Sequence, residues 1–414
     1  MTPTALASLA MFGGKPVYQG CWPNWPRVRN LSQVLARIES LLQTTRWTLR
    51  VPGTRPSLAE QFEEKWAAIS GCRFALAVTS GSSAIELALR GLEVKPGDEV
   101  IVPAMGWYAT AAAVSRVGAI PVFADVDPRT TCLDPTEVEQ RITTRTVAII
   151  AVHLHSAIAD LARLAEIASR RSLALVEDAA QAHGGRFFNR PVGSIGQIGC
   201  FSFNQEKLVP AGEGGVVVTD DEELFQRMYA SRTDGYTHPS PCDGSFFSDG
   251  RFRGNNQCLS ELHAILLLEQ LEFFSEETQL REKNAAALDQ ALAAIFAVEP
   301  LTSTPGTTVR PFYEYGFTCL PGAFGDWSLL QVAQALSKET GIDFHETDPP
   351  VEICPLFAPA REAMAPPKAL QVYQNLLVFH HRYLLSAEVS SVVPHAIQKV
   401  IAVAREVPAA SLSA

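Results

Sequence analysis

Lys207 is the residue of this sequence whose surroundings point most directly to chemistry. It ends the stretch Ser202–Lys207 and is followed by the glycine-rich stretch Ala211–Gly215. A lysine that forms a Schiff base with a bulky cofactor needs small, flexible neighbours, and glycines let the cofactor lie against the backbone. The pattern favours a lysine that binds pyridoxal phosphate. A surface lysine before a glycine turn is the alternative interpretation if this motif stands alone.

Asp178 supplies a second group that this cofactor requires. It follows the apolar stretch Leu173–Glu177, which predicts a strand that leaves the carboxylate buried at its end. Such a carboxylate can keep the pyridine nitrogen protonated, and the ring then becomes an electron sink. An aspartate that caps the next helix is the other interpretation. We therefore predict pyridoxal phosphate as the cofactor, with Lys207 and Asp178 as catalytic residues.

The cofactor's phosphate needs hydrogen-bond donors and a positive potential. Gly81, Ser82 and Ser83 stand at the start of a predicted helix, where backbone N–H groups, hydroxyls and the helix dipole come together. A plain helix cap uses the same geometry and is the competing interpretation. We predict that these three residues bind the cofactor phosphate.

Several further motifs extend along most of the chain. They are Gly13–Pro16, Trp22–Pro26, Thr79–Ala84, Gly97–Pro103 and Gly254–Glu261. Together with the motifs around Asp178 and Lys207, the set resembles the DegT/DnrJ/EryC1/StrS family of sugar and cyclitol aminotransferases. The resemblance implies the fold type I architecture of pyridoxal phosphate enzymes.

The resemblance also implies further cofactor contacts. Ser202 matches the family's second phosphate hydroxyl, and Gln181 matches a residue near the 3-hydroxyl of the ring. Trp107 stands where the family often places an aromatic ring over the cofactor, although a buried core tryptophan is the competing interpretation. Asn256 matches an asparagine that reaches the phosphate of the neighbouring subunit. A homodimer with shared active sites is therefore expected.

The implied activity is transfer of an amino group from glutamine or glutamate to a ketocyclitol or keto-sugar, as in aminoglycoside-like biosynthesis. Lys207 favours this reaction, because family members that only remove a hydroxyl carry histidine there. The segments Trp22–Pro26 and Arg46-Trp47 resemble the branch that includes the ketocyclitol (scyllo-inosose) aminotransferases and the aminohydroxybenzoate synthases. A dehydrating, aromatising lyase and a non-catalytic regulatory protein are the alternatives.

His155 and Glu206 depart from the pattern of the family, whereas His153 follows it. His153 and His155 alternate along a predicted strand and would share one face, but no third ligand is near, so we predict no metal site. His153 resembles a family histidine that lines the pocket. His155 stands where the family usually has Tyr or Phe followed by Gly, and Glu206 is larger and more acidic than the residue expected beside the lysine.

Composition agrees with a soluble enzyme. The chain has 414 residues, 47% of them hydrophobic, and a net charge of −10, which argues against a nucleic-acid surface. No apolar run has membrane-spanning length, and the first residues do not read as a signal peptide. The eight cysteines lack a C-x-x-C pair. We expect a cytoplasmic protein that binds small molecules, with no membrane or nucleic-acid partner.

Short apolar runs alternate with helical patterns between Phe74 and Val218, which predicts an α/β fold with a mostly parallel central sheet flanked by helices. Ligands of such sheets bind beyond the carboxyl ends of the strands. Later segments predict a long helix, a strand at Tyr313–Cys319 and a helix at Leu329–Thr340, and Pro366-Pro367 is typical of a loop. We expect three parts: residues 1–30 near the substrate site, a large cofactor-binding domain at 31–275, and a small C-terminal α+β domain at 276–414.

Overall fold

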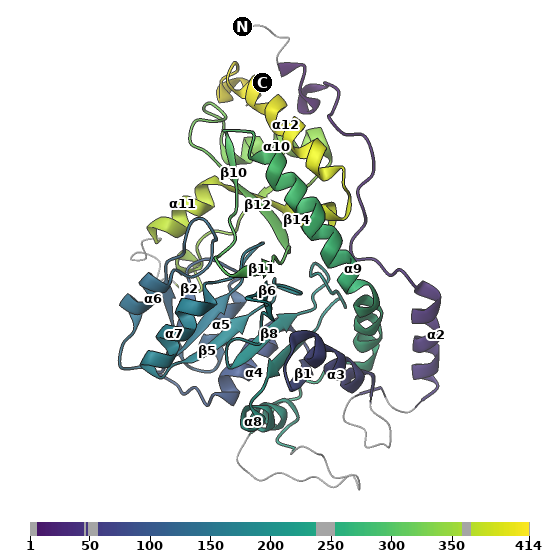
Figure 1. Cartoon of the computed structure of the whole chain (residues 1–414), viewed down its shortest axis with the longest axis vertical. Helices are drawn as coiled ribbons and strands as arrows, with labels where there is room; N and C mark the ends of the chain where they lie inside the picture. The colour runs from purple at the N-terminus through teal and green to yellow at the C-terminus, as the bar shows by residue number, and fades with distance from the viewer. Residues whose placement is uncertain (1–5, 45–46, 49–56, 237–252, 358–365, 414) are drawn as a thin grey trace.

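The structure is a computed structural model that describes residues 6–44, 47–48, 57–236, 253–357 and 366–413. It has a larger α/β part and a smaller part, and one long helix runs between them (Figure 1). Arg46 lies outside the described residues.

A seven-stranded sheet with the order β1-β9-β8-β5-β4-β2-β3 forms the middle of the larger part. The pairs β2–β3, β2–β4, β4–β5 and β5–β8 are parallel, whereas β9 runs antiparallel to both of its neighbours. This confirms the prediction of a mostly parallel sheet. The strands are β1 (Phe74–Val78), β2 (Glu99–Pro103), β3 (Ile120–Ala124), β4 (Thr146–Val152), β5 (Ala174–Asp178), β8 (Ile198–Ser202) and β9 (Gly215–Thr219).

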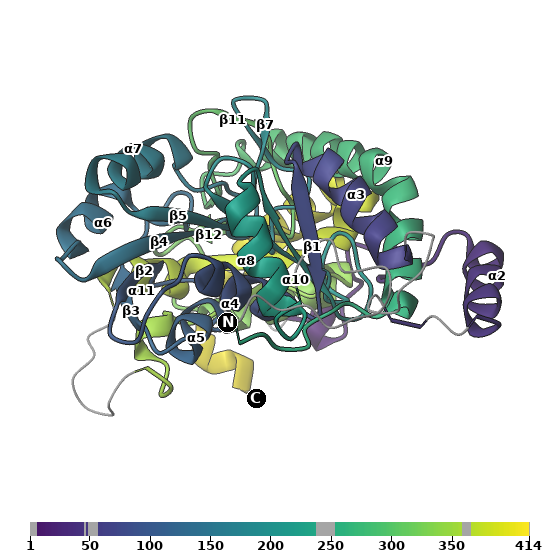
Figure 2. The same cartoon turned by 90° about the horizontal axis from the view of Figure 1, so that it is seen from below.

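Helices lie on both sides of this sheet (Figures 1 and 2). Helix α4 packs against α5 and α8, and α6 packs on α7. Every residue of β2, β8 and β9 is buried, as expected for strands that are covered on both faces. The helices are α3 (Leu58–Ser70), α4 (Gly81–Gly91), α5 (Ala109–Arg116), α6 (Pro135–Arg141), α7 (Leu161–Arg171) and α8 (Glu222–Arg232).

Helix α9 (Glu261–Leu292) leads from the large sheet into the smaller part, which has its own hydrophobic core. That part contains an antiparallel sheet with the order β10-β12-β14-β13. A boundary at residue 275/276 would fall inside α9, and it stays a prediction. The elements are β10 (Val298–Pro300), β12 (Glu314–Cys319), β13 (His345–Glu346), β14 (Leu376–His380), α10 (Leu329–Thr340), α11 (Pro367–Asn375) and α12 (Val389–Ala404).

Short elements complete the described chain. A three-stranded sheet, β11-β6-β7, lies beside the junction of the two parts. Its strands are β6 (Arg186–Phe187), β7 (Arg190–Pro191) and β11 (Thr307–Val309), and the 3-10 helices are η1 (Ala10–Phe12), η2 (Val351–Ile353), η3 (His381–Leu385) and η4 (Ala409–Ser413).

The N-terminal segment runs along the smaller part before it reaches α2 (Leu31–Leu42), which lies beside α9 (Figure 1). The indole N–H of Trp22 donates to the Thr340 carbonyl at 2.8 Å. The ring of Trp25 meets that of His381 edge-on, with 4.7 Å between the centroids. The segment is thus fastened to the smaller part by its tryptophans.

Two prolines stand at the start of α11. The expected loop includes Pro366, which is the non-helical N-cap of α11, but the expectation is wrong for Pro367, the first residue of that helix. Proline suits the first helical position, where its missing N–H has no helical partner to lose.

Of the helices in the described part of the chain, none combines the length and apolar composition that crossing a bilayer needs.

Candidate active site

A cavity of about 520 Å³ lies between the large sheet and the smaller part. Its wall includes the ends of β4, β5 and β8, the start of α4, and residues of β12 and β13. Gly81, Ser82, Trp107, Asp178, Gln181, Ser202 and Lys207 all line it. The fold therefore brings together seven of the nine cofactor-binding candidates named from the sequence.

The start of α4 forms one end of the cavity. Ser80 is the N-cap, and its hydroxyl accepts the Ser83 N–H at 3.1 Å. A Cβ atom on Gly81 would stand 2.6 Å from the Cβ of Ser202, so only glycine allows α4 and β8 to approach this closely. The result is a helix N-terminus and two serine hydroxyls, those of Ser82 and Ser202, at the edge of a cavity.

Ser83 and Asn256 stand apart from the other candidates. The Ser83 hydroxyl is 3.0 Å from those of Thr79 and Ser80, and its residue does not line the cavity in this chain. Asn256 is exposed and forms an antiparallel bridge with Thr233, also outside the lining.

Asp178 is buried at the end of β5. Thr110 donates its hydroxyl to one carboxylate oxygen at 2.7 Å, and the Ala180 N–H reaches the other at 3.2 Å. Burial raises the pKa of Asp178, and these hydrogen bonds act against that rise. A cationic group beside the carboxylate would further favour its charged form.

Trp107 is half exposed in the cavity wall, with 53% of its surface accessible. Its ring lies against that of Tyr108, with 4.3 Å between the centroids. Because the side chain is so accessible, the interpretation of Trp107 as a buried core residue is wrong. A flat ligand could stack on the indole.

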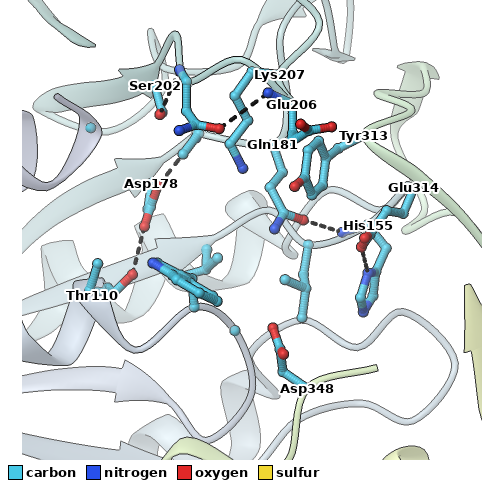
Figure 3. A pocket seen from close by; sticks show the side chains of 18 of the residues that line it. Thr110, His155, Asp178, Gln181, Ser202, Glu206, Lys207, Tyr313, Glu314 and Asp348 are labelled. Atoms are coloured by element: carbon cyan, nitrogen blue, oxygen red, sulfur yellow. Dashed lines mark hydrogen bonds and ion pairs between the residues drawn. The ribbon is translucent and has the colours of Figure 1, made fainter. Parts of the chain in front are cut away.

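Lys207 projects into the cavity from the loop that follows β8 (Figure 3). Its amine lies over the ring of Tyr313, 3.7 Å from the centroid. Burial lowers the pKa of Lys207 from 10.5 to about 8, although the nearby carboxylates of Glu314 and Asp178 oppose this change. The amine is therefore partly neutral near physiological pH.

The loop that carries Lys207 is held by the smaller part. The carbonyl oxygen of Glu206 accepts hydrogen bonds from the Nε2 atoms of His380 at 2.9 Å and His381 at 3.1 Å. The Arg382 N–H donates to Nδ1 of His380 at 3.2 Å, which leaves the proton of that ring on Nε2. Glu206 thus fixes the loop through its backbone, a role that its large acidic side chain did not predict.

A second cluster of polar residues forms the opposite wall. His155 is in the left-handed region, with φ of 56°, and its Nδ1 lies 2.8 Å from Glu314. Its Nε2 lies 3.1 Å from the Thr347 hydroxyl, and its backbone N–H donates to Gln181 at 2.8 Å. Burial acts to raise the pKa of Glu314, but hydrogen bonds from His155 and His345 hold it well below its ordinary value. Strained backbone with several fixed contacts is typical of a functional site.

The histidine pair differs from the sequence-based expectation. Strand β4 ends at Val152, so His153 and His155 do not share a strand face. The Nε2 of His153 lies 3.2 Å from Glu177, whereas His155 pairs with Glu314. Across the described residues, no group of three His, Cys, Asp or Glu side chains is arranged to hold a metal ion.

Several residues of the site were not predicted from the sequence as site residues. Among them are Thr110, Tyr313, Glu314, His345 and Thr347. The sequence pattern predicted the strand that contains Glu314, but it gave no sign that this end of the strand faces the lysine.

The arrangement suits pyridoxal phosphate. The α4 N-terminus offers donors for a phosphate, Asp178 is a buried partner for a pyridine nitrogen, and Lys207 is a buried amine that can bind an aldehyde covalently. The cavity volume lies within the usual range for small-molecule sites. The fold and these groups define a fold type I, pyridoxal phosphate-dependent aminotransferase.

The chain belongs to the DegT/DnrJ/EryC1/StrS aminotransferase family, which it matches over residues 33–398. It is 37% identical over 398 residues to the L-glutamine:2-deoxy-scyllo-inosose aminotransferase of Micromonospora echinospora, an alignment that covers 92% of this chain and 94% of that protein. The identity to the L-glutamine:scyllo-inosose aminotransferase of Streptomyces griseus is 36% over 423 residues, covering 97% and 99%. The crystal structure of 3-amino-5-hydroxybenzoic acid synthase is similar, with a TM-score of 0.82, 28% identity and coverage of 94% and 99%.

The protonation of Lys207 can be tested directly. We expect the rate at which the cofactor-free chain captures pyridoxal phosphate to rise with pH through about 8, because only the neutral amine attacks the aldehyde. The rate is measured from the visible absorption of the bound cofactor over a pH series that brackets this value. A midpoint near the ordinary 10.5 of a lysine would contradict the burial argument. Lys207→Ala is the control and should capture none of the cofactor covalently.

Proposed function

We propose that this aminotransferase moves the amino group of glutamine to a ketocyclitol, with Lys207 and Asp178 as its catalytic residues. The observation that carries the proposal is the convergence of a desolvated amine, a buried carboxylate and a helix N-terminus on one cavity. The bound cofactor supplies an electron sink for the carbanion at the reacting carbon.

Lys207 would hold the cofactor covalently and, as a base, would accept a proton from the α-carbon of the amino donor. A general base works best when its pKa lies near the working pH, and a value of about 8 meets that condition. Asp178 would keep the pyridine nitrogen protonated, and the hydrogen bond from Thr110 fixes the direction of the Asp178 carboxylate. Gly81, Ser82 and Ser202 would bind the phosphate, whereas the hydroxyl and the backbone N–H of Ser83 are already bonded within the helix cap. Trp107 would stack on the ring, and Gln181 would lie near its 3-hydroxyl.

A neutral ring rich in hydroxyls is the substrate that the cavity supports best. Its wall offers histidine, threonine, glutamine and carboxylate groups that can exchange hydrogen bonds with hydroxyls. The described lining residues of this chain include no arginine and a single lysine. A nucleotide-linked sugar would need cations for its two phosphates. The relatives named as scyllo-inosose aminotransferases support the same choice.

We propose that the enzyme is a cytoplasmic homodimer in which Asn256 reaches the phosphate in the partner's site. Asn256 is exposed outside the cavity of its own chain, as such a role requires. Helix α2 also carries exposed leucines at positions 31, 35 and 42, which a partner subunit would cover.

Asp178→Asn should leave the cofactor bound but lower turnover by about two to four orders of magnitude, because an unprotonated ring is a poor electron sink. Single-turnover kinetics with glutamine and a spectrum of the bound cofactor measure both effects. Transamination at the parent rate would show that Asp178 has another role.

The ketone can be identified with a panel in which glutamine is the donor. We expect amine formation on 2-deoxy-scyllo-inosose or a close ketocyclitol and none on a nucleotide-linked keto-sugar, detected by mass spectrometry. The reverse preference would refute the ketocyclitol proposal and keep the aminotransferase chemistry. Release of an aromatic amine from an aminoshikimate-type ring would support the lyase alternative, and absence of any reaction with glutamine would support the regulatory one.

The shared site can be tested by mixing two inactive variants, Lys207→Ala and Asn256→Ala. In a mixed dimer, one site has the Lys207 of one chain and the Asn256 of the other, so activity should return to about a quarter of the parent value after random exchange of subunits. If the mixture stays as inactive as its components, Asn256 does not serve the partner's site. Light scattering confirms that both variants and the mixture are dimers.

A further inference from the structure

The amine of Lys207 lies against an aromatic ring and not against an oxygen atom. Its Nζ atom forms no hydrogen bond or ion pair with any residue that the structure describes. The face of the Tyr313 ring lies beneath it, with 3.7 Å between Nζ and the ring centroid. Figure 3 shows this ring beside the end of the lysine side chain. An aromatic face carries negative potential, and it attracts an ammonium most strongly where water is excluded.

The backbone of Tyr313 fixes the ring in this place. Tyr313 stands immediately before β12, and its N–H donates to the His155 carbonyl at 3.1 Å. Its own carbonyl accepts the backbone N–H of His381, also at 3.1 Å. The ring meets that of His380 edge-on, with 6.2 Å between the centroids. His380 and His381 also hold the Glu206 carbonyl, so the ring and the lysine loop are fixed to one support.

The face of the ring, and not the hydroxyl, is what meets the amine. Burial raises the pKa of the Tyr313 hydroxyl, and the carboxylates of Glu314 and Glu206 raise it further. The hydroxyl is therefore neutral and is no anionic partner for Lys207. It also forms no hydrogen bond within the described part of the chain.

The charged groups around Lys207 favour the protonated amine without contacting it. They are carboxylates from both parts of the structure: Glu314 in β12, Asp178 in β5, Glu206 in the lysine loop and Asp348 after β13. The imidazole of His183 is a further titratable group nearby, and burial lowers its pKa to about 3, so it is neutral near physiological pH. These groups affect how readily the amine is charged, whereas the ring determines where the amine lies.

We propose that Tyr313 is a further catalytic residue, whose ring face holds the Lys207 amine while that amine is free and positions it to take the proton from the α-carbon of the amino donor. The inference rests on the proposed function, in which Lys207 is the base. The proton passes to Nζ, and the electron pair of the broken C–H bond passes to the electron sink that the cofactor supplies. A lysine has a long, flexible side chain, and misplacing a reacting group by about 1 Å can cost on the order of 10²-fold in rate. Because the face attracts the charged amine, it holds Lys207 most firmly once the proton has arrived.

Fluorination of the ring separates its electrostatic role from its shape. Tyr313→Phe is made first, followed by phenylalanines with one, two and three ring fluorines at the same position, since each fluorine weakens the negative face with little change in size. The readout is the pH midpoint at which the cofactor-free chain captures pyridoxal phosphate, which requires no turnover. The matched control is the same fluorinated series at Phe312, a buried ring beside Arg310 that does not line the cavity.

We expect Tyr313→Phe to keep the parent midpoint of about 8, and three fluorines to lower it by about one pH unit. A weaker face stabilises the charged amine less, so the proton leaves at lower pH. Fluorination at Phe312 should leave the midpoint unchanged. A midpoint that ignores fluorination at position 313 overturns the proposal. A shift in Tyr313→Phe as large as that with three fluorines overturns it too, because the hydroxyl would then be the active group.

The positioning of the base is measured in a single turnover of the holoenzyme with glutamine. Tyr313→Phe should react within about twofold of the parent rate. Tyr313→Leu keeps an apolar side chain but has no ring, and it should be slower by about tenfold or more. A Tyr313→Leu variant that binds the cofactor and reacts at the parent rate refutes the role of the ring.

Failure of the proposed function would look different. A parent enzyme whose midpoint responds to fluorination at position 313, but which converts no ketocyclitol, refutes the substrate assignment and supports the role of Tyr313. A parent enzyme that converts a ketocyclitol while its midpoint ignores fluorination refutes only Tyr313. Covalent capture of the cofactor by Lys207→Ala refutes both, because the reacting amine would then be another one.

Discussion

The site depends on burying one lysine amine among carboxylates without letting it become fully charged. Desolvation lowers the pKa of Lys207, and the acidic groups around it limit the shift to a value of about 8. The size of this shift matters for chemistry. At pH 7.5 an amine with that pKa is neutral in roughly a quarter of molecules, whereas at the ordinary value of 10.5 only about one in a thousand is neutral. Burial thus makes part of the Lys207 amine neutral and able to act as a base. The nearby carboxylates keep the remainder protonated.

Both parts of the structure are needed to produce this burial. Lys207 belongs to the larger part, but the ring beneath its amine is that of Tyr313, immediately before β12. The histidines that hold the Glu206 carbonyl come from β14 and η3, and Trp25 of the N-terminal segment packs on one of them. None of the residues Trp22–Pro26 lines the cavity of this chain. The segment reaches the lysine loop only indirectly, because Trp25 packs on His381 and the His381 ring donates to the Glu206 carbonyl.

The sequence predicted those features that local patterns encode. Alternating apolar runs predicted the parallel sheet, and the polar residue that ends β5 was correctly expected to be buried. Thr110, Tyr313 and Glu314 escaped prediction because their roles arise only when distant segments pack together. His155 shows a further limit: its left-handed backbone redirects a side chain that strand alternation would have placed beside His153. Hydrogen bonding at a helix cap is equally hard to foresee, and it turns the Ser83 hydroxyl toward Ser80.

The charge of the cavity links the cofactor to the choice of amino donor. Within the described lining, the groups at the α4 end are neutral serines and backbone N–H groups, so the cofactor phosphate would add negative charge to a cavity that is already acidic. Lys207 would not balance this charge fully, because its free amine is only partly charged near neutral pH and the bound cofactor would occupy it. A glutamate donor would bring a side-chain carboxylate into this field in addition to its α-carboxylate, whereas glutamine brings a neutral amide that can exchange hydrogen bonds with acids and histidines alike. The same field that disfavours anionic sugars therefore favours glutamine over glutamate, since one electrostatic property of the wall acts on both substrates of the reaction.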